Sequence, residues 1–165
     1  MILLRREDHH MVFFISPREK TALLALLDLY PLVPVSHQSP ERLGDSPRLA
    51  ESRQLLLESA QFMQEQHRSW MEKHWFSGTR FQTSGSGFVF EASPDDAERL
   101  LQILNDIRVG SWMALGSPDI SALRQTPGAQ EISSNFLHME LAGYFQTGIL
   151  QSFQSSPDQT PNPGN

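Results

Sequence analysis

The chain has 165 residues, of which 39 % are hydrophobic and 19 % are charged, and its formal net charge is −6. This length and composition are typical of one soluble globular domain. The acidic balance and the lack of any run of Lys and Arg argue against binding to a phosphate backbone, which needs clustered positive charge. We therefore expect no nucleic-acid partner.

The sequence contains no cysteine, which excludes disulfides, thiolate nucleophiles and zinc sites that use Cys ligands. Charged residues at positions 5–8 interrupt the apolar amino terminus, so it does not have the pattern of a signal peptide. No apolar run approaches the roughly 20 residues that span a bilayer. These features predict a cytoplasmic protein without a membrane partner.

The first part of the chain predicts a strand followed by a helix. Residues 1–8 are expected to be a loose terminus, and residues 10–15 (HMVFFI) have the short apolar pattern of a buried strand. Ser16-Pro17 and Glu19 together form the signature of a capping box with proline in the first turn. A leucine-rich helix is therefore expected over 17–30.

A long helix is expected in the middle of the chain, after an irregular Pro- and Ser-rich connection over 31–46. Between Pro47 and Phe76 there is neither Pro nor Gly, and Leu, Glu, Gln and Arg are frequent. These residues predict one helix of roughly 45 Å. Ser77-Gly78 ends it, with glycine in its usual carboxyl-terminal position.

A second strand and helix follow. Residues 79–83 and 88–92 flank a Ser-Gly-Ser-Gly loop and are compatible with a β-hairpin. The helix expected over 94–115 is the most clearly patterned in the chain, with apolar residues at 3.6-residue spacing. Asp95 and Asp96 lie in its first turn, where negative charge suits the helix dipole.

A turn at 126–128 and a last helix over 129–153 complete the predicted domain. Residues 155–165 (SSPDQTPNPGN) lack core-forming side chains and predict a disordered tail. We therefore expect one mainly α, bundle-like helical domain over 1–154, with three long helices and a minor two-stranded β element.

The two strand–helix segments resemble each other. Residues 12–30 align with 89–107 at an offset of 77, so that Ser16-Pro17 falls on Ser93-Pro94 and the paired leucines coincide. One interpretation is that any capped, buried helix shows this pattern. The other is that two units pack around a pseudo-two-fold axis, with their strands paired and covered by the helices.

An unusual polar cluster, Asn105, Asp106 and Arg108, lies within the apolar helix of residues 94–115. Buried polar groups must be paired, so the cluster either bridges helices or forms part of a binding surface. Two aromatic residues, Trp112 and Tyr144, complete the candidate binding set. They contribute either to the core or to a partner groove.

The sequence shows no catalytic or metal-binding motif. It has neither a GxSxG motif nor a P-loop, and no pair of carboxylates stands out for acid–base chemistry. His67 and His74 share a helix face but lack the i, i+4 spacing and third ligand of a zinc helix. These observations favour a non-enzymatic protein without a metal or cofactor.

Three short motifs carry a family resemblance: Leu104-Asn105-Asp106-Ile107-Arg108, Leu115-Gly116, and Tyr144 followed by Leu150-Gln151. With the strand and helix over 12–30, they resemble a bacterial family of uncharacterised proteins. The resemblance implies no assigned activity. Members of that family are often encoded beside the Clp protease adaptor, and this association implies a role near regulated proteolysis.

The sequence leaves two functions open. The first is a protein-interaction or regulatory factor with a protein partner, for which a second copy of the chain in a homodimer is one candidate. The alternative is a small enzyme or ligand-binding protein with a pocket between the helix over 94–115 and the last helix.

Overall fold

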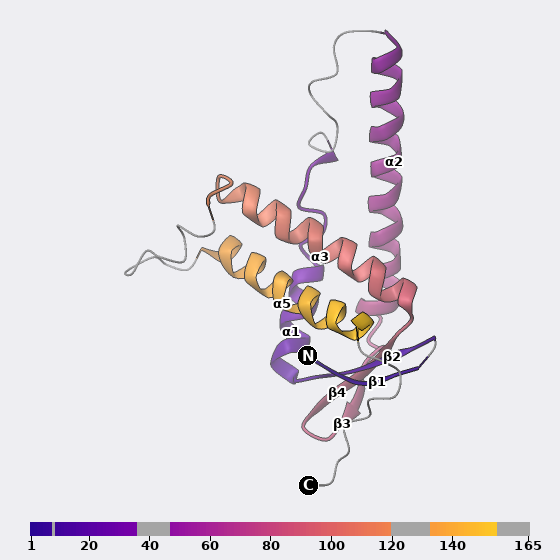
Figure 1. Cartoon of the computed structure of the whole chain (residues 1–165), viewed down its shortest axis with the longest axis vertical. Helices are drawn as coiled ribbons and strands as arrows, with labels where there is room; N and C mark the ends of the chain where they lie inside the picture. Colours follow the sequence, from indigo (N-terminus) through magenta and orange to yellow (C-terminus); the bar gives the residue numbers. More distant parts are fainter. Residues whose placement is uncertain (8, 36–46, 120–132, 155–165) are drawn as a thin grey trace.

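The computed structural model describes residues 1–7, 9–35, 47–119 and 133–154 (Figure 1). Within these ranges the protein is mainly α, with four helices and a four-stranded antiparallel sheet. The strands are β1 (Ile2–Arg6), β2 (Met11–Ile15), β3 (Gln82–Ser84) and β4 (Gly87–Ala92). The helices are α1 (Pro17–Leu27), α2 (Pro47–Met71), α3 (Pro94–Ala114) and α5 (Ser134–Gln154), and a π-helical turn, η2 (Glu72–Phe76), continues α2.

The sheet has the strand order β1-β2-β4-β3. The prediction of a two-stranded β element was therefore wrong, because each central strand also pairs with a hairpin partner at the edge of the sheet. The expectation of a loose terminus over 1–8 was wrong for β1. A bulge between Leu3 and Arg5 breaks the alternation that identifies a strand. Arg6 anchors β1 by donating hydrogen bonds to the carbonyl oxygens of Ser152 (3.2 Å) and Phe153 (2.8 Å) in α5.

The two central strands pair around Phe13 and Phe90. These residues lie opposite each other in the antiparallel β2–β4 pair, and their rings stack with centroids 5.2 Å apart. They are also equivalent under the sequence offset of 77 residues. An antiparallel pair centred on two equivalent residues has the register that a two-fold axis requires. The pairing of the two strands therefore has the local two-fold register that the second interpretation of the sequence predicts.

The hairpins and helix caps follow the same equivalence. Ser16 and Ser93 are the N-caps of α1 and α3, and each completes a capping box with the acidic residue three positions later. Close to their turns, the two hairpins also pair equivalent residues. The equivalent pairs are Arg6 with Met11 in β1–β2 and Thr83 with Phe88 in β3–β4.

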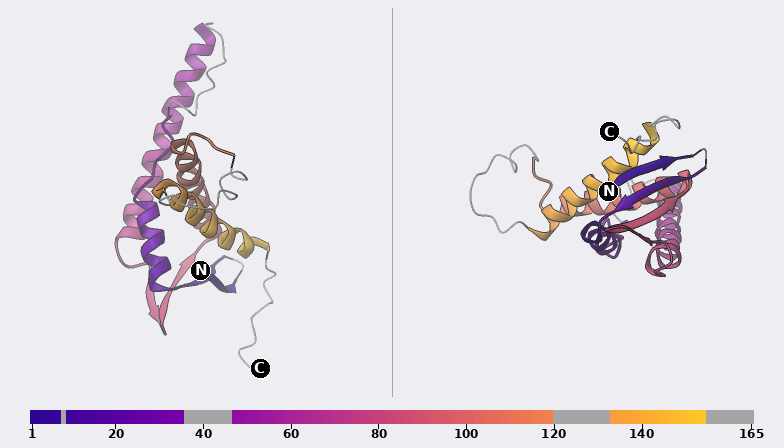
Figure 2. Two further views of the ribbon diagram at one scale, coloured as in Figure 1. Left: turned by 90° about the vertical axis from the view of Figure 1, so that its left-hand side faces the viewer. Right: turned by 90° about the horizontal axis from the view of Figure 1, so that it is seen from below.

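The core lies between the sheet and the helices α1, α3 and α5, which pack together on it (Figure 2). Both central strands and all three helices contribute apolar side chains, and burying each one stabilises the fold by about 1.5–3 kcal/mol. Members of this core include Met11, Phe13, Ile15, Phe90, Leu23, Leu26, Leu27, Leu100, Ile103, Leu104, Ile107, Phe145 and Ile149.

Helix α2 is anchored at its carboxyl-terminal end. His67, Trp70 and Met71 are buried there, and Trp75 of η2 enters the core. The rest of the helix projects beyond the other helices (Figures 1 and 2), and no side chain over 50–66 is buried. Helix α2 is therefore an arm attached to the domain by its last turns.

Most predicted helices agree with the structure. The long helix expected over 47–76 is formed by α2 and η2, and the helix expected over 94–115 ends at Ala114. The predicted turn at 126–128, the start of the last helix before 133 and the predicted tail over 155–165 lie outside the described residues. None of the helices in the described ranges combines the length and apolarity needed to cross a bilayer.

Candidate binding groove between α2 and α3

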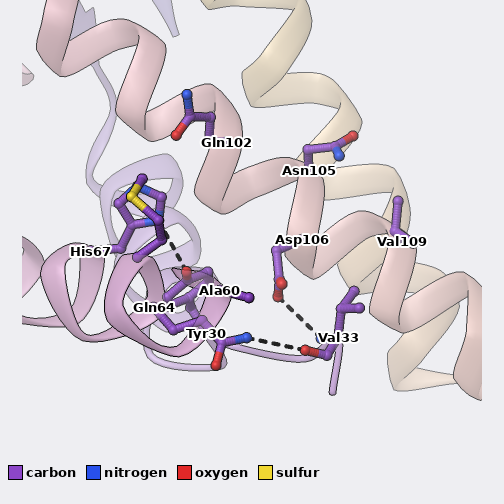
Figure 3. A pocket seen from close by; sticks show the side chains of 10 residues that line it. Tyr30, Val33, Ala60, Gln64, His67, Gln102, Asn105, Asp106 and Val109 are labelled. Carbon is purple, nitrogen blue, oxygen red and sulfur yellow. Dashed lines mark hydrogen bonds between the residues drawn. The ribbon is translucent and has the colours of Figure 1, made fainter. Parts of the chain in front are cut away.

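Two adjoining cavities, of about 400 and 410 Å³, form a groove between α2 and α3. They share Met63 and His67 from α2 and Gln102 from α3. The first cavity, drawn in Figure 3, is also lined by Tyr30 and Val33 from the segment that follows α1. The groove is therefore built from three parts of the chain that are far apart in sequence.

The segment over 30–33 is held in place from both sides of the groove (Figure 3). One carboxylate oxygen of Asp106 in α3 accepts hydrogen bonds from the backbone N–H groups of Leu32 (2.7 Å) and Val33 (3.2 Å). From α2, the amide nitrogen of Gln64 donates to the carbonyl oxygen of Val33 (3.3 Å). Leu32 also packs directly against the backbone of α3 at Gly110. These contacts fix the position of the segment that lines the first cavity.

Burial raises the pKa of the Asp106 carboxyl, although the hydrogen bonds from the N–H groups of Leu32 and Val33 act in the opposite direction. Folding therefore favours the protonated form of this group. The contribution of Asp106 to stability is fully present below its unfolded pKa and decreases as the pH rises through the folded pKa.

Substitutions of Asp106 separate its hydrogen-bonding role from its charge. Asp106→Ala is expected to lower the free energy of unfolding by about 1–3 kcal/mol, because two partly buried N–H groups lose their acceptor. Asp106→Asn keeps an acceptor oxygen without the charge. The free energy of unfolding of wild type, minus that of Asp106→Asn, should therefore decrease as the pH is raised from 4 to 7. Urea unfolding of both proteins measures this difference. An increase over that range would contradict the stated pKa shift.

A buried Tyr30–His67 pair forms the polar end of the first cavity. The Tyr30 hydroxyl lies 3.0 Å from Nδ1 of His67. Burial, with a smaller effect of the Arg99 charge, lowers the pKa of His67. Burial, with the nearby Asp106 carboxylate, raises the pKa of Tyr30 to about 12. Both groups are therefore neutral at pH 7, so this part of the groove is polar and uncharged.

The second cavity carries most of the charge in the groove. Asp95, Glu98 and Arg99 line it together with Gln66. The guanidinium of Arg99 lies 5.4 Å from the centroid of the Trp70 ring, in a cation–π contact. Asp106 adds a further carboxyl group to the first cavity, so acidic groups outnumber basic ones along the groove.

The structure divides the five candidate residues predicted from sequence between different surfaces. Asn105 and Asp106 line the groove. Arg108 is exposed, and its Nη1 lies 3.5 Å from Oε1 of Gln146 in α5. The indole nitrogen of Trp112 donates to the carbonyl oxygen of Pro118 (3.0 Å). The partners of Asp106 are backbone groups, so it does not form the Asp–Arg network that the sequence suggested.

Tyr144 lies away from the groove, where it connects α5 to α1. Its hydroxyl donates to the carboxylate of Glu19, which the amino group of Met1 also contacts. The hydrogen bond to Glu19 and partial burial raise the pKa of Tyr144 to about 12. Partial burial alone would raise the pKa of Glu19, but hydrogen bonds from Met1, Tyr144 and Ser16 together lower it to about 2.

The sequence interpretation missed most residues that line the groove. Gln102, Asn105, Asp106 and Val109 form one face of α3 at helical spacing. This spacing identifies a helix face, but only the position of α2 shows that the face lines a groove. Gln64 and the segment over 30–33 had no sequence signal of their own.

Metal binding finds no support in the part of the chain that the structure describes. Over those residues, no three His, Asp or Glu side chains come close enough together to hold a metal ion.

Over the described residues, the protein is mainly α, with a four-stranded antiparallel sheet of order β1-β2-β4-β3 and a groove beside the projecting helix α2. Comparisons with protein-family models, curated proteins and solved structures found no match to this chain. The resemblance to the bacterial family of uncharacterised proteins therefore stays a prediction.

Proposed function

We propose that the protein is a non-enzymatic interaction factor that binds a segment of a partner protein in the groove between α2 and α3. The lining of the groove carries this proposal. The amide side chains of Gln102 and Asn105 offer both donors and acceptors to a peptide backbone. Met63 and Val109 are exposed in the first cavity and offer apolar contact to partner side chains.

The polar groups of the groove support binding more than catalysis. Tyr30 and His67 are buried and hydrogen-bonded to each other, and Asp106 is engaged by the backbone of Leu32 and Val33. The described lining residues include no Ser, Thr, Cys or Lys side chain. The one lining hydroxyl, that of Tyr30, is buried and already engaged by His67. The groups left to face a ligand are amides, apolar side chains and the charges of the second cavity.

The sequence resemblance suggests where the partner belongs. Proteins of the family that this chain resembles are often encoded beside the Clp protease adaptor, so we propose a partner among the components of regulated bacterial proteolysis. This part of the proposal rests on the resemblance alone. The groove and its test do not depend on it.

Matched tryptophan substitutions on α3 test the groove. Asn105→Trp places a large side chain in the first cavity. Arg108→Trp introduces the same residue at an exposed position outside the groove, where the wild-type guanidinium lies 3.5 Å from Oε1 of Gln146 in α5. In quantitative pull-downs, tagged Asn105→Trp should recover at least tenfold less of each partner protein than tagged wild type. Tagged Arg108→Trp should recover as much as wild type. Equal recovery with all three proteins would overturn the proposal.

Binding of a small ligand is the second candidate function, and the volume of the first cavity favours it. A cavity of about 400 Å³ lies within the range of small-molecule sites. The sequence placed this alternative between α3 and α5, whereas both cavities described above lie between α2 and α3. A metabolite that raises the melting temperature of wild type but not of Asn105→Trp would support this candidate.

A further inference from the structure

Four large apolar side chains are exposed on the projecting part of α2. Their exposed fractions are 61 % for Leu55, 50 % for Leu56, 59 % for Phe62 and 46 % for Met63. Single exposed apolar residues are common on protein surfaces, but a cluster of large ones marks an interaction site. We refer to these four residues as the α2 strip.

The spacing of the α2 strip makes it one continuous helix face. Leu55 and Phe62 are seven residues apart, as are Leu56 and Met63, so each pair lies almost directly in line along the helix. The two rows together cover an arc of about 100°, the usual width of a buried helix face. Ala60 and Gln64, which line the groove, are on the adjoining, partly buried side of α2, next to Met63.

A row of acidic residues borders the strip on one side. Glu51, Glu58 and Glu65 are exposed and repeat at the same spacing of seven residues. At 100° per residue, this row lies beside the Leu55–Phe62 row. The chain as a whole carries a net charge of −6. Charge complementarity therefore favours a cationic partner for this surface.

The same acidic row disfavours a second copy of the chain as the occupant. If two α2 helices packed antiparallel through their strips, the two-fold axis would place Glu58 opposite its own counterpart. Glu51 of one copy would then face Glu65 of the other. Like charges at these flanking positions destabilise a helix pair, whereas Lys or Arg at the facing positions of a different chain would stabilise it.

We propose that the α2 strip docks a basic amphipathic helix of another protein. The partner helix would place apolar residues at i, i+3 or i+4, and i+7 against Leu55 and Phe62. Its Lys or Arg residues would lie along the glutamate row. This inference goes beyond the proposed function, because it rests on Leu55, Leu56 and Phe62, which line neither cavity, and only Met63 borders the groove as well. It can hold or fail independently of the groove.

A peptide-display selection tests the chemistry of the occupant directly. A library of 18-residue peptides is selected on the full-length wild type, with counter-selection on the double variant Leu55→Ser/Phe62→Ser. Because both side chains are largely exposed, the variant should fold normally, as circular dichroism can verify. Enriched peptides should carry Lys or Arg beside apolar residues at helical spacing. Failure to enrich, or enrichment of acidic or non-periodic peptides, would overturn the proposal.

Fluorescence anisotropy with the most enriched peptide then measures the contribution of each feature. Leu55→Ser/Phe62→Ser should weaken binding at least tenfold. The matched variant Leu137→Ser/Leu150→Ser, at exposed positions of α5, should bind like wild type. Replacing the three glutamates with Lys should also weaken binding at least tenfold, and added salt should weaken binding to wild type. Equal affinity for wild type and Leu55→Ser/Phe62→Ser would overturn the proposal.

Two further measurements separate the other occupants. Asn105→Trp, which fills the groove, should leave peptide binding unchanged. If it abolished binding while Leu55→Ser/Phe62→Ser did not, the peptide would occupy the groove, in agreement with the proposed function and against this inference. A wild-type dimer that sedimentation detects and Leu55→Ser/Phe62→Ser abolishes would identify a second copy as the occupant and overturn the proposal.

Discussion

Replacing Trp75 with alanine is expected to lower the free energy of unfolding by about 3–5 kcal/mol. Only 1 % of this residue is exposed. The centroid of its ring system lies 6.0 Å from that of Trp70, 5.8 Å from that of Phe81 and 5.4 Å from that of Phe90. Removing it leaves a cavity at the point where η2 joins the α2 arm to the sheet, so the substitution should also loosen α2.

Neighbouring substitutions provide the controls for this prediction. Phe76 follows Trp75 directly but is 43 % exposed, so Phe76→Ala should cost less than about 1 kcal/mol. Trp75→Phe should cost less than Trp75→Ala. It keeps an aromatic ring in the core and removes a buried indole N–H that has no hydrogen-bond partner in the described structure. Urea unfolding followed by circular dichroism measures all three, and equal losses for Trp75→Ala and Phe76→Ala would contradict the prediction.

Gly110→Ala is expected to lower the free energy of unfolding by about 1–3 kcal/mol, although alanine favours helices. A Cβ atom at Gly110 would lie 2.4 Å from Cβ and 2.9 Å from the carbonyl carbon of Leu32. The backbone of Leu32 cannot move away freely because Asp106 holds its N–H group. The substitution should therefore displace the segment over 30–33 and weaken the proposed partner binding in the groove.

Gly143→Ala is the matched control, because it makes the same change within another helix. A Cβ atom at Gly143 would have only Nε of Arg108 within 4 Å among its non-local neighbours, at 3.9 Å. This substitution should raise the free energy of unfolding by about 0.5–1 kcal/mol, since alanine restricts the unfolded chain and favours the helix. Destabilisation by both variants, or by neither, in parallel urea titrations would show that the contact with Leu32 is not decisive.

The features that the sequence predicted well are those encoded by neighbouring residues. The Ser-Pro starts of α1 and α3 are local signals, and both helices begin where the signals indicate. The resemblance between the two halves also indicated the central strand pairing, because the equivalent residues Phe13 and Phe90 face each other. Capping and periodicity act within a few residues, so they can be recognised without knowledge of the fold.

The groove could not be predicted in the same way, because it depends on contacts between distant segments. Asp106 was recognised as an unusual polar residue, but its partners Leu32 and Val33 lie 74 and 73 residues away. Similarly, nothing near Arg6 in the sequence indicates its hydrogen bonds to the end of α5. These positions depend on how the whole chain packs, which periodicity does not reveal.

The central pairing of β2 with β4 has a consequence for the rate at which the protein folds. Phe13 and Phe90 are 77 residues apart, so their contact closes a long loop, whereas each hairpin forms between neighbouring residues. During synthesis, β2 has no partner on its inner edge until β4 has been made. The nascent chain therefore carries an open strand edge, and its sheet is completed only after the second half of the chain arrives.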